Sequence, residues 1–311
     1  MKLNKGTLIA DIGSTNARIA LTCNGKEYLN PVIYKMKDFA SIESIFSKYL
    51  YSLNKLGHVK RAIIGVAAPI LEDEIKFINS SFTFKQSELK KNLFQEKLLV
   101  LNDLEIQSHG LSSTTEDEKV LIGRTKNIEK GPKILVIPGT GLGLAGIVED
   151  TIVSTEAGHL NIPENLKSTG FLMRSFKKDF KRMPTFEDFL SGKGISYVYS
   201  QISSDKTKLL SSKEIFKGND NIEKSEETRE YFVFLLAIYL RYMALIWGAK
   251  GGVFIAGSII NSLTEEIKEA SFRKTFEDSY TMKSFLTHVP IYQVKLLNLG
   301  LRGALKLFSL T

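Results

Sequence analysis

Residues 6–21 read GTLIADIGSTNARIAL, and they place a carboxylate and a small polar turn between two apolar runs. The first run ends at Asp11, and the chain becomes apolar again after the turn. Apolar runs bounded by glycine and small polar residues are typical of buried strands. We therefore expect two adjacent strands joined by a flexible turn. The pair Asn24-Gly25 predicts a two-residue hairpin turn after the second strand.

A second stretch, KILVIPGTGLGLAGIVEDTIVS at 133–154, follows the same order of strand, small turn, strand, turn and strand. The two stretches therefore indicate one supersecondary unit used twice. Apolar residues at helical spacing predict a helix within 37–57. Short apolar runs at 61–70 and 96–103 predict buried strands. This alternation of strands and helices indicates an α/β layered fold.

The composition is that of a soluble globular protein large enough for two domains, with 311 residues, 43% hydrophobic and 24% charged. A single cysteine excludes an intrachain disulfide and a Cys-rich zinc site. The long apolar region 231–249 is interrupted by Arg241, which favours a buried helix over a membrane span. The N-terminal apolar patch, cut off by Asp11, does not resemble a signal peptide. We therefore expect a cytoplasmic protein with no membrane partner.

The net charge of +8 and the pI near 9.2 require nucleic acid to be considered as a partner. The basic residues are spread along the chain, and the one dense cluster, RSFKKDFKR at 174–182, contains an aspartate. The sequence has no helix-turn-helix, zinc-finger or RRM-type motif. We therefore expect a solvated basic face and no nucleic-acid partner.

The segment GLGLAG at 141–146 matches the G-x-G-x-x-G pattern of dinucleotide-binding folds. That pattern requires a helix after the turn, whereas the following residues have the pattern of a hairpin. What remains is Gly139-Thr140-Gly141 between two strands. Backbone N–H groups in such a turn can surround an anion, with the threonine hydroxyl as a further donor. A glycine-rich hairpin without a ligand is an equally good interpretation of this turn alone.

The first turn places Asp11 beside Gly13, Ser14 and Thr15. A carboxylate next to a phosphate-binding turn requires a divalent cation between them, because two anions repel. This pattern predicts that Asp11 anchors Mg²⁺, directly or through water. A strand-end cap is the alternative interpretation.

Three further polar sites follow predicted strands or turns. Asn102 and Asp103 end a buried strand, where ligands bind in α/β sheets, and such an aspartate can accept a proton from a hydroxyl. Glu156 and His159 form a candidate pair for binding hydroxyl groups. Glu187, taken alone, is better explained as a charge near a helix N-terminus. Together these sites predict a metal–nucleotide bound on two hairpins and a hydroxylated substrate near an aspartate.

In order and wording, the motifs resemble those of the bacterial glucokinases in the hexokinase–actin–Hsp70 superfamily, in the group without a zinc-binding cysteine motif. The resemblance covers nearly the whole chain. It rests on the segments ADIGSTNARIAL, LNDL, PGTGLGLA, EAGHLNI, FEDFLSG, GGVFIAGSII and FRKTFEDSYTMKSFLTHVPIY.

The resemblance implies ATP-dependent phosphorylation of glucose at the 6-hydroxyl, with Asp103 as the general base and Mg²⁺ organised by Asp11. It implies sugar-binding roles for Asn102, Asp103, Glu156, His159 and Glu187. It implies phosphate-binding roles for Asp11, Gly13, Ser14, Thr15, Asn16, Gly139, Thr140 and Gly141. It implies adenosine contacts for Gly257 and Ser258.

The implied fold is two ribonuclease-H-like (actin-like) α/β domains with a ligand cleft between them. The small domain would comprise residues 1–109 and 291–311, and the large domain 110–290. The family suggests a homodimer. A kinase for another hexose or an N-acetylated amino sugar, and a non-catalytic sugar-sensing regulator, are the alternative functions.

The chain departs from the family pattern where Ser14, Ala157 and Ser258 stand at glycine positions. Serine or alanine is tolerated at such positions where φ stays negative.

Overall fold

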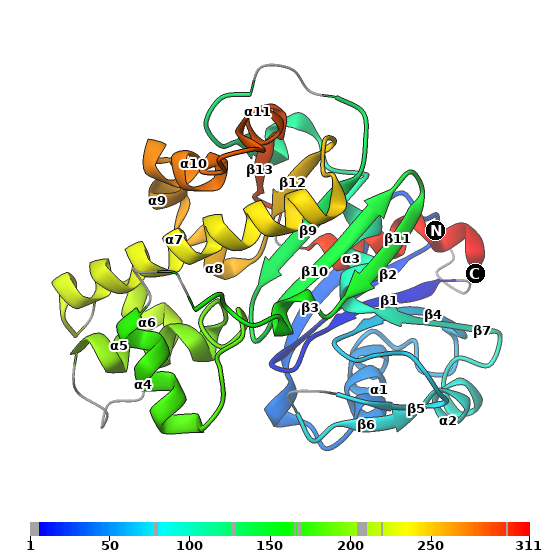
Figure 1. The fold of residues 1–311 in the computed structure, drawn as a ribbon. Coiled ribbons are helices and arrows are strands. Elements are labelled where there is room, and N and C mark those ends of the chain that lie inside the picture. Colours follow the sequence, from blue (N-terminus) through cyan, green and yellow to red (C-terminus); the bar gives the residue numbers. More distant parts are fainter. Residues whose placement is uncertain are drawn as a thin grey trace. The chain divides into compact units, whose positions relative to one another are not determined.

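The computed structural model describes residues 6–77, 80–125, 129–164, 166, 170–203, 210–218, 220–296 and 298–311. Contacts within the chain divide it into two compact units. The first unit comprises Met1–Thr115 and Asn298–Thr311, and the second comprises Glu116–Leu297. Each unit is an α/β structure built on its own sheet (Figure 1), which confirms the predicted fold class.

The first unit has a five-stranded sheet in the order β3-β2-β1-β4-β7 and a separate two-stranded sheet, β5-β6. Its elements are β1 (Thr7–Ile12), β2 (Asn16–Thr22), β3 (Leu29–Lys35), the 3-10 helix η1 (Met36–Asp38), α1 (Ile42–Ser52), β4 (Arg61–Val66), β5 (Glu74–Lys76), β6 (Thr83–Lys85), α2 (Gln86–Asn92), β7 (Lys97–Asn102), α3 (Asp103–Leu111), α12 (Leu299–Lys306) and the 3-10 helix η5 (Phe308–Leu310).

Strand β1 is buried on both faces of this sheet. Successive side chains of a strand point to opposite faces. Leu8 packs in one apolar cluster with Phe46 of α1, whereas Ile9 packs in another with Leu301 of α12. Asp11 lies two residues after Ile9 and therefore shares the face that α12 covers. This alternation explains how a carboxylate comes to be buried at the end of an apolar strand.

The second unit has a six-stranded sheet in the order β11-β10-β9-β12-β13-β8. Its elements are the 3-10 helix η2 (Glu116–Glu118), β8 (Lys119–Leu121), β9 (Lys133–Pro138), β10 (Leu142–Val148), β11 (Thr151–Thr155), the 3-10 helix η3 (Ala157–His159), α4 (Gly170–Phe180), α5 (Gly192–Ser203), α6 (Ser212–Phe216), α7 (Ile222–Trp247), β12 (Gly252–Ile255), α8 (Ser258–Asn261), α9 (Thr264–Lys268), α10 (Ala270–Glu277), α11 (Lys283–His288) and β13 (Ile291–Val294).

The two main sheets repeat one topology. In each, three consecutive strands form an antiparallel meander, β1-β2-β3 in the first unit and β9-β10-β11 in the second. A later strand then pairs in parallel with the first strand of the meander, β4 with β1 and β12 with β9, and a second one pairs in parallel with that strand, β7 with β4 and β13 with β12. This shared order confirms the internal repeat predicted from the two glycine-containing stretches.

Helix α7 spans 26 residues and carries the long apolar region. Among the residues that the structure describes, it is the one helix long and apolar enough to cross a membrane by length and composition. Leu235, Leu236, Tyr239 and Leu240 of this helix are fully buried in the core of the second unit. The prediction of a buried helix in this region is therefore confirmed.

The predicted two-residue turn at Asn24-Gly25 is wrong. Strand β2 ends at Thr22 and β3 begins at Leu29, so the connection is longer. The Thr22 hydroxyl accepts a hydrogen bond from Gly25 N at 3.0 Å and donates one to Glu27 O at 2.8 Å. These side-chain bonds satisfy loop backbone groups that a tight hairpin would pair directly.

Residues from 291 onward were expected in the small domain, and β13 differs from that expectation. All four of its residues are buried, and it pairs with β12 on one side and β8 on the other within the second unit. An apolar strand gains most by burial inside a sheet, where both of its edges are also hydrogen-bonded. The division into domains 1–109 plus 291–311 and 110–290 stays a prediction.

Candidate active site

The first glycine turn connects β1 to β2 in the first unit. Gly13 N donates to Asn16 O at 2.9 Å, which closes the turn. Met36 N donates to Thr15 O at 2.9 Å and attaches the turn to the end of β3. The turn is therefore short and fixed at both ends, with Thr15 exposed and Ser14 half-buried.

Asp11 is buried at the start of this turn. Its side chain is 7% exposed, and the Asp11 Oδ2–Arg18 Nη1 distance is 3.7 Å. A Cβ added to Gly300 of α12 would lie 2.5 Å from Asp11 Cγ, so only a glycine fits against the carboxylate. Burial raises the pKa of Asp11, and the nearby Arg18 lowers it by less. A desolvated carboxylate with one distant cation is electrostatically suited to a further positive charge.

Asn102 and Asp103 lie where β7 ends and α3 begins. Asn102 caps the helix, since its Oδ1 accepts from Leu104 N at 2.9 Å, and its Nδ2 donates to Ala68 O at 3.2 Å. Asp103 Oδ1 also accepts from Leu104 N, at 2.9 Å. The structure therefore holds Asp103, which is half-buried, in a defined orientation at the carboxyl end of the parallel strands.

The second glycine turn connects β9 to β10 in the second unit. Gly139 N donates to Gly141 O at 2.8 Å, and Gly192 N at the start of α5 donates to Gly139 O at 2.8 Å. The residues that follow form a hairpin, because β10 pairs antiparallel with β11. The exclusion of a dinucleotide-binding fold is therefore confirmed.

Glu187 is bound to this second turn, which the sequence did not indicate. Its Oε2 accepts from Leu142 N at 2.8 Å, and a Cβ added to Gly141 would lie 2.6 Å from the same oxygen. Glu187 N donates to Gly158 O at 2.9 Å. Glu187 lies in the turn before α5 and not at a helix N-terminus. One residue therefore connects the glycine turn with the Glu156–His159 segment.

Glu156 and His159 lie close together, as their spacing predicts. His159 Nε2 is 3.7 Å from Glu156 Oε2, and both side chains are exposed. Gly158 between them packs tightly on Leu142, since an added Cβ would lie 2.4 Å from Leu142 O. This contact fixes η3 against the first residue of β10.

His159 and Glu187 share a cavity of about 470 Å³ within the second unit. It is also lined by Asn161, Arg182, Met183, Thr185 and Asp188. A cavity of this size with several hydroxyl, amide and carboxylate groups suits a small polar ligand.

The wall of this cavity contains an ion pair that the sequence did not indicate, between the half-exposed Arg182 and the more buried Asp188. Asp188 accepts from Arg182 Nη1 at 2.6 Å and Nη2 at 2.7 Å, and from both Thr185 N and Thr185 Oγ1 at 2.8 Å. Arg182 also lies over the Phe176 ring, 4.9 Å from its centroid. Arg182 belongs to the basic cluster that was interpreted as a solvated face. The threonine three residues before an aspartate was the available signal for a side-chain-bonded turn.

The third glycine turn lies between β12 and α8. Gly257 has a φ of 105°, a conformation that favours glycine, and an added Cβ would lie 3.2 Å from Pro138 O. Ser258 is the first residue of α8. Gly257 therefore follows β12 at the same end of the sheet at which Gly139 follows β9, since these two strands are parallel.

None of the three departures from the family's glycine pattern strains the backbone. Within the described part of the chain, four non-glycine residues have positive φ, namely Asn30, Asn54, Glu149 and Lys181. Ser14, Ala157 and Ser258 are described and are not among them. Serine and alanine are thus accommodated at these positions without a left-handed conformation.

The repeated sheet and its glycine turns are those of the two-domain sugar kinases with an actin-like fold. The crystal structure of a glucokinase from an Antarctic psychrotroph has a TM-score of 0.79 and 26% identity, covering 98% of this chain and 99% of that chain. A glucokinase from Balamuthia mandrillaris, solved in complex with glucose, shares the fold with a TM-score of 0.80 at 20% identity, covering 97% of this chain and 92% of that chain.

The sequence model of the family described as Glucokinase matches residues 8–310, and the chain belongs to this family. A glucokinase of Neisseria meningitidis is 29% identical over 306 residues, which cover 96% of this chain and 93% of the relative. A glucokinase of Campylobacter jejuni subsp. doylei is 29% identical over 300 residues, covering 92% and 89%. Family membership identifies the chain as a hexokinase-type sugar kinase that phosphorylates glucose with ATP.

Proposed function

We propose that Asp103 is the general base in the transfer of the γ-phosphoryl group of ATP to the 6-hydroxyl of glucose. The observation that supports this role is the position of Asp103 between β7 and α3, where Asn102 and Leu104 N fix its surroundings. The first turn of a helix stabilises the ionised form of a carboxylate, which is the form a base needs. Ligands of α/β sheets bind at this end of parallel strands.

In the proposed reaction, the Asp103 carboxylate takes the proton of the glucose 6-hydroxyl as that oxygen bonds to the γ-phosphorus. The bond between the γ-phosphorus and the bridging oxygen breaks, and ADP leaves with that oxygen. Asp103 then releases the proton to water. Phosphoryl transfer of this kind depends mainly on positioning and on neutralising charge.

The same proposal assigns the sugar hydroxyl groups to Asn102, Glu156, His159 and Glu187. Support comes from the cavity that His159 and Glu187 share, and from the 3.7 Å approach of His159 to Glu156. Carboxylates accept and imidazole donates hydrogen bonds, so this set complements a ring of hydroxyl groups.

We further propose that the glycine turns bind the nucleotide. Gly13, Ser14, Thr15 and Asn16 in the first turn, and Gly139, Thr140 and Gly141 in the second, present short, fixed backbone segments to the phosphates. Gly257 and Ser258 would contact adenosine. Backbone N–H groups in tight glycine turns bind anions without a dedicated side chain.

Asp11 fits a role in holding Mg²⁺. Its carboxylate is buried, its pKa is raised by burial, and Arg18 at 3.7 Å is too far to neutralise it by a direct hydrogen bond. Mg²⁺ is commonly held by one or two carboxylates together with substrate phosphates and water, and when bound it neutralises phosphate charge. Among the described residues no three His, Cys, Asp or Glu side chains gather as a metal-ligand set.

We also propose that the protein is a cytoplasmic homodimer that has no membrane or nucleic-acid partner. The buried position of α7 in the second unit supports the proposal about the membrane. The mixing of an acidic residue into the basic cluster at 174–182 supports the proposal about nucleic acid.

A coupled kinase assay tests the proposed substrate and donor. Glucose, mannose and N-acetylglucosamine would be compared with ATP and Mg²⁺, and polyphosphate would replace ATP in a parallel series. We expect the highest kcat/KM for glucose with ATP. A higher kcat/KM for another sugar would reassign the substrate. Glucose binding by calorimetry without any sugar phosphate formed would favour the sugar-sensing regulator.

A further inference from the structure

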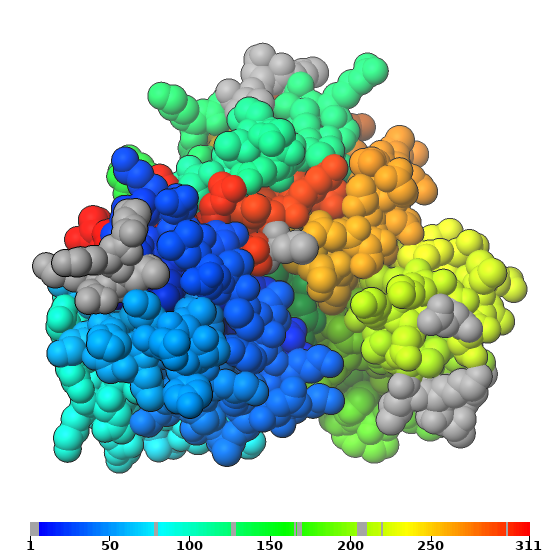
Figure 2. Space-filling view, turned by 180° about the vertical axis from the view of Figure 1, so that it is seen from behind, coloured from blue at the N-terminus to red at the C-terminus, as the bar shows by residue number. Residues whose placement is uncertain are grey.

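A second cavity of the second unit, with a volume of about 780 Å³, lies away from the glycine turns. It is lined by residues of α10, by Gly123 and Arg124 after β8, and by Lys283 at the start of α11. In the space-filling view, the orange surface of the α9–α10 region adjoins the sea-green surface of the β8 region (Figure 2).

This cavity is at the opposite end of the sheet from the proposed nucleotide site. Strand β8 runs antiparallel to β13, and Leu121 pairs with Tyr292. Gly123, two residues further along the chain, therefore lies at the end of the sheet where β13 begins. Gly139 and Gly257 follow the other ends of strands parallel to β13. A ligand in this cavity would therefore be distinct from the nucleotide.

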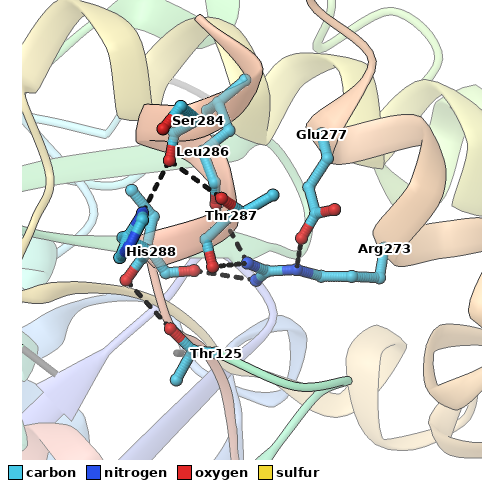
Figure 3. Close-up of polar contacts among 8 residues, drawn as sticks. Thr125, Arg273, Glu277, Ser284, Leu286, Thr287 and His288 are labelled. Carbon is cyan, nitrogen blue, oxygen red and sulfur yellow. Dashed lines mark hydrogen bonds and ion pairs between the residues drawn. The ribbon is translucent and has the colours of Figure 1, made fainter. Parts of the chain in front are cut away.

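Arg273 fixes two walls of the cavity to each other (Figure 3). Its Nη1 donates to Val289 O at 2.8 Å, and its Nη2 donates to Leu286 O at 2.9 Å. Its Nε donates to Glu277 Oε1 at 2.5 Å. The Arg273 guanidinium thus connects α10 to the end of α11. Gly123 also packs closely on Arg273, since a Cβ added to Gly123 would lie 3.0 Å from Arg273 Cγ.

Three further hydrogen bonds hold the remaining walls. Thr125 Oγ1 donates to His288 O at 3.0 Å, which attaches the segment after β8 to the last residue of α11 (Figure 3). Arg241 of α7 donates to Asp278 O and to Thr275 O at the end of α10. The cavity is therefore formed in advance of any ligand, which reduces the entropy lost on binding.

The lining is strongly basic. It contains five cationic side chains, Arg124, Lys268, Arg273, Lys274 and Lys283, and two acidic ones, Glu277 and Asp278. Glu277 is paired with Arg273, and Asp278 lies 4.0 Å from Arg241. Lys268 is paired with Glu265.

Three lining cations remain for a ligand. Within the described ranges, no acidic side chain pairs with Arg124, Lys274 or Lys283. The hydroxyl group of Thr275 also lines the cavity and adds a donor, whereas the Ser271 hydroxyl already donates to Glu269 Oε2 at 3.3 Å. Cations gathered in a concave site concentrate positive potential and attract an anion more strongly than dispersed surface lysines.

We propose that this cavity is a binding site for a phosphorylated small molecule. Arg124, Lys274 and Lys283 bind the phosphate dianion, with Thr275 as a neutral donor. Arg273 has a structural role, because its guanidinium is already bonded to Glu277 and to backbone carbonyls. The volume lies within the range of small-molecule sites, so the cavity has room for more than the phosphate group.

The test measures the affinity of the full-length protein for inorganic phosphate and for glucose 6-phosphate by calorimetry at constant ionic strength. The first probe represents free phosphate and the second a phosphate ester. The test variant is Lys274→Glu/Lys283→Glu. The matched control is Lys177→Glu/Lys178→Glu, which changes the same charge at exposed residues of α4 outside the cavity. Neither variant alters a residue proposed for catalysis, so both should keep glucose phosphorylation, which shows that they are folded.

We expect the Lys274→Glu/Lys283→Glu variant to lose about tenfold or more in affinity for at least one probe, with the control near wild type. Hydrogen exchange should show protection of residues 268–283 on ligand binding to the wild type. Equal affinities in all three proteins, no binding of either probe to the wild type, or protection confined to the glycine turns would overturn the proposal.

Discussion

At the scale of single residues, Glu187 has two partners that belong to different parts of the proposed site. Its carboxylate accepts from Leu142 N beside the second glycine turn, and its N–H donates to Gly158 O in the Glu156–His159 segment. We therefore expect a change at Glu187 to affect the turn proposed to bind phosphate as well as the proposed sugar site. This property distinguishes it from Glu156, whose side chain is 72% exposed.

Glu187→Gln tests this connection. The amide is a weaker, neutral acceptor for Leu142 N, so we expect kcat/KM to fall roughly 5- to 50-fold, with a higher KM for both glucose and ATP. Glu156→Gln is the matched control and should raise the KM for glucose alone. Steady-state kinetics with each substrate varied in turn provide the measurement. An unchanged KM for ATP in Glu187→Gln would contradict the connection.

Asp188 should make stability depend on pH. Burial raises the pKa of Asp188, but the hydrogen bonds from Arg182 and Thr185 outweigh burial and hold the pKa below its ordinary value. The ionised form therefore stabilises the fold above the ordinary pKa of about 3.9, and this contribution is lost as the pH falls through the lower, folded-state pKa. Asp188→Asn should cost about 1–3 kcal/mol at pH 7.

The measurement is thermal unfolding of wild type and Asp188→Asn at neutral pH and near pH 3. The difference in Tm between the two proteins should be largest at neutral pH and should shrink on acidification. A difference that is independent of pH would show that Asp188 acts by packing and not through its charge.

Single-residue placement was predictable where a residue follows directly from a strand. Asp11 and Asp103 were predicted as strand-end carboxylates, and the structure has them there. The bond from Leu142 N to Glu187 was not predictable, because it joins residues 45 apart in the chain that only tertiary packing brings together. The Arg182–Asp188 pair was missed because a basic cluster in sequence does not reveal which of its members pairs with a carboxylate outside the cluster.

At the scale of elements, the crossing of α3 and α12 positions two residues of the proposed site. Asp103 is the first residue of α3, and Gly300 of α12 packs on Asp11. The helices approach at glycines: a Cβ added to Gly303 would lie 1.7 Å from Ile106 O. Side chains at this crossing would push the helices apart and move both carboxylates.

Gly303→Ala tests the crossing. The added methyl group meets backbone and not a flexible side chain, so we expect a loss of about 2–4 kcal/mol in the free energy of unfolding. Gly170→Ala, at the first residue of α4, is the control, because an added Cβ there meets only the Arg174 Nη1 at 3.3 Å. Urea unfolding measures both variants. Equal stabilities of the two would contradict the role of the crossing.

Element prediction succeeded where hydrophobic pattern and turn chemistry agree. The meander of the second unit followed from apolar runs separated by glycine and by Glu149-Asp150, and β10 and β11 pair as expected. It failed at Asn24-Gly25, because Thr22 bonds within the loop and lengthens it. Side-chain bonds to loop backbone are local, yet hydrophobic periodicity carries no sign of them.

At the scale of the whole molecule, the chain uses one sheet topology in each of its two compact units. Each unit has its own apolar core. The repeat was visible in the sequence because both copies keep an apolar strand, a small turn and a second strand. The sequence did not reveal which unit contains β13. A short apolar strand can join either sheet, and only its long-range pairing decides between the two sheets.

The net charge of +8 permits weak, non-specific attraction of polyanions. If this charge is a solvated face, as we propose, duplex DNA should be retained only at low salt and released by about 0.15–0.2 M salt, because non-specific phosphate contacts weaken steeply with salt. Filter retention across a salt series measures this. Binding that survives at the higher salt concentrations would indicate a nucleic-acid partner.

The role of Asp103 in glucose phosphorylation is the central claim, and Asp103→Asn tests it most directly. Asparagine keeps an Oδ1 that can accept from Leu104 N but cannot take a proton from the sugar. We expect kcat to fall by about 10²- to 10⁴-fold, while the calorimetric Kd for glucose stays within about threefold of wild type. A kcat close to that of the wild type, with glucose binding intact, would contradict the assignment of Asp103 as the base.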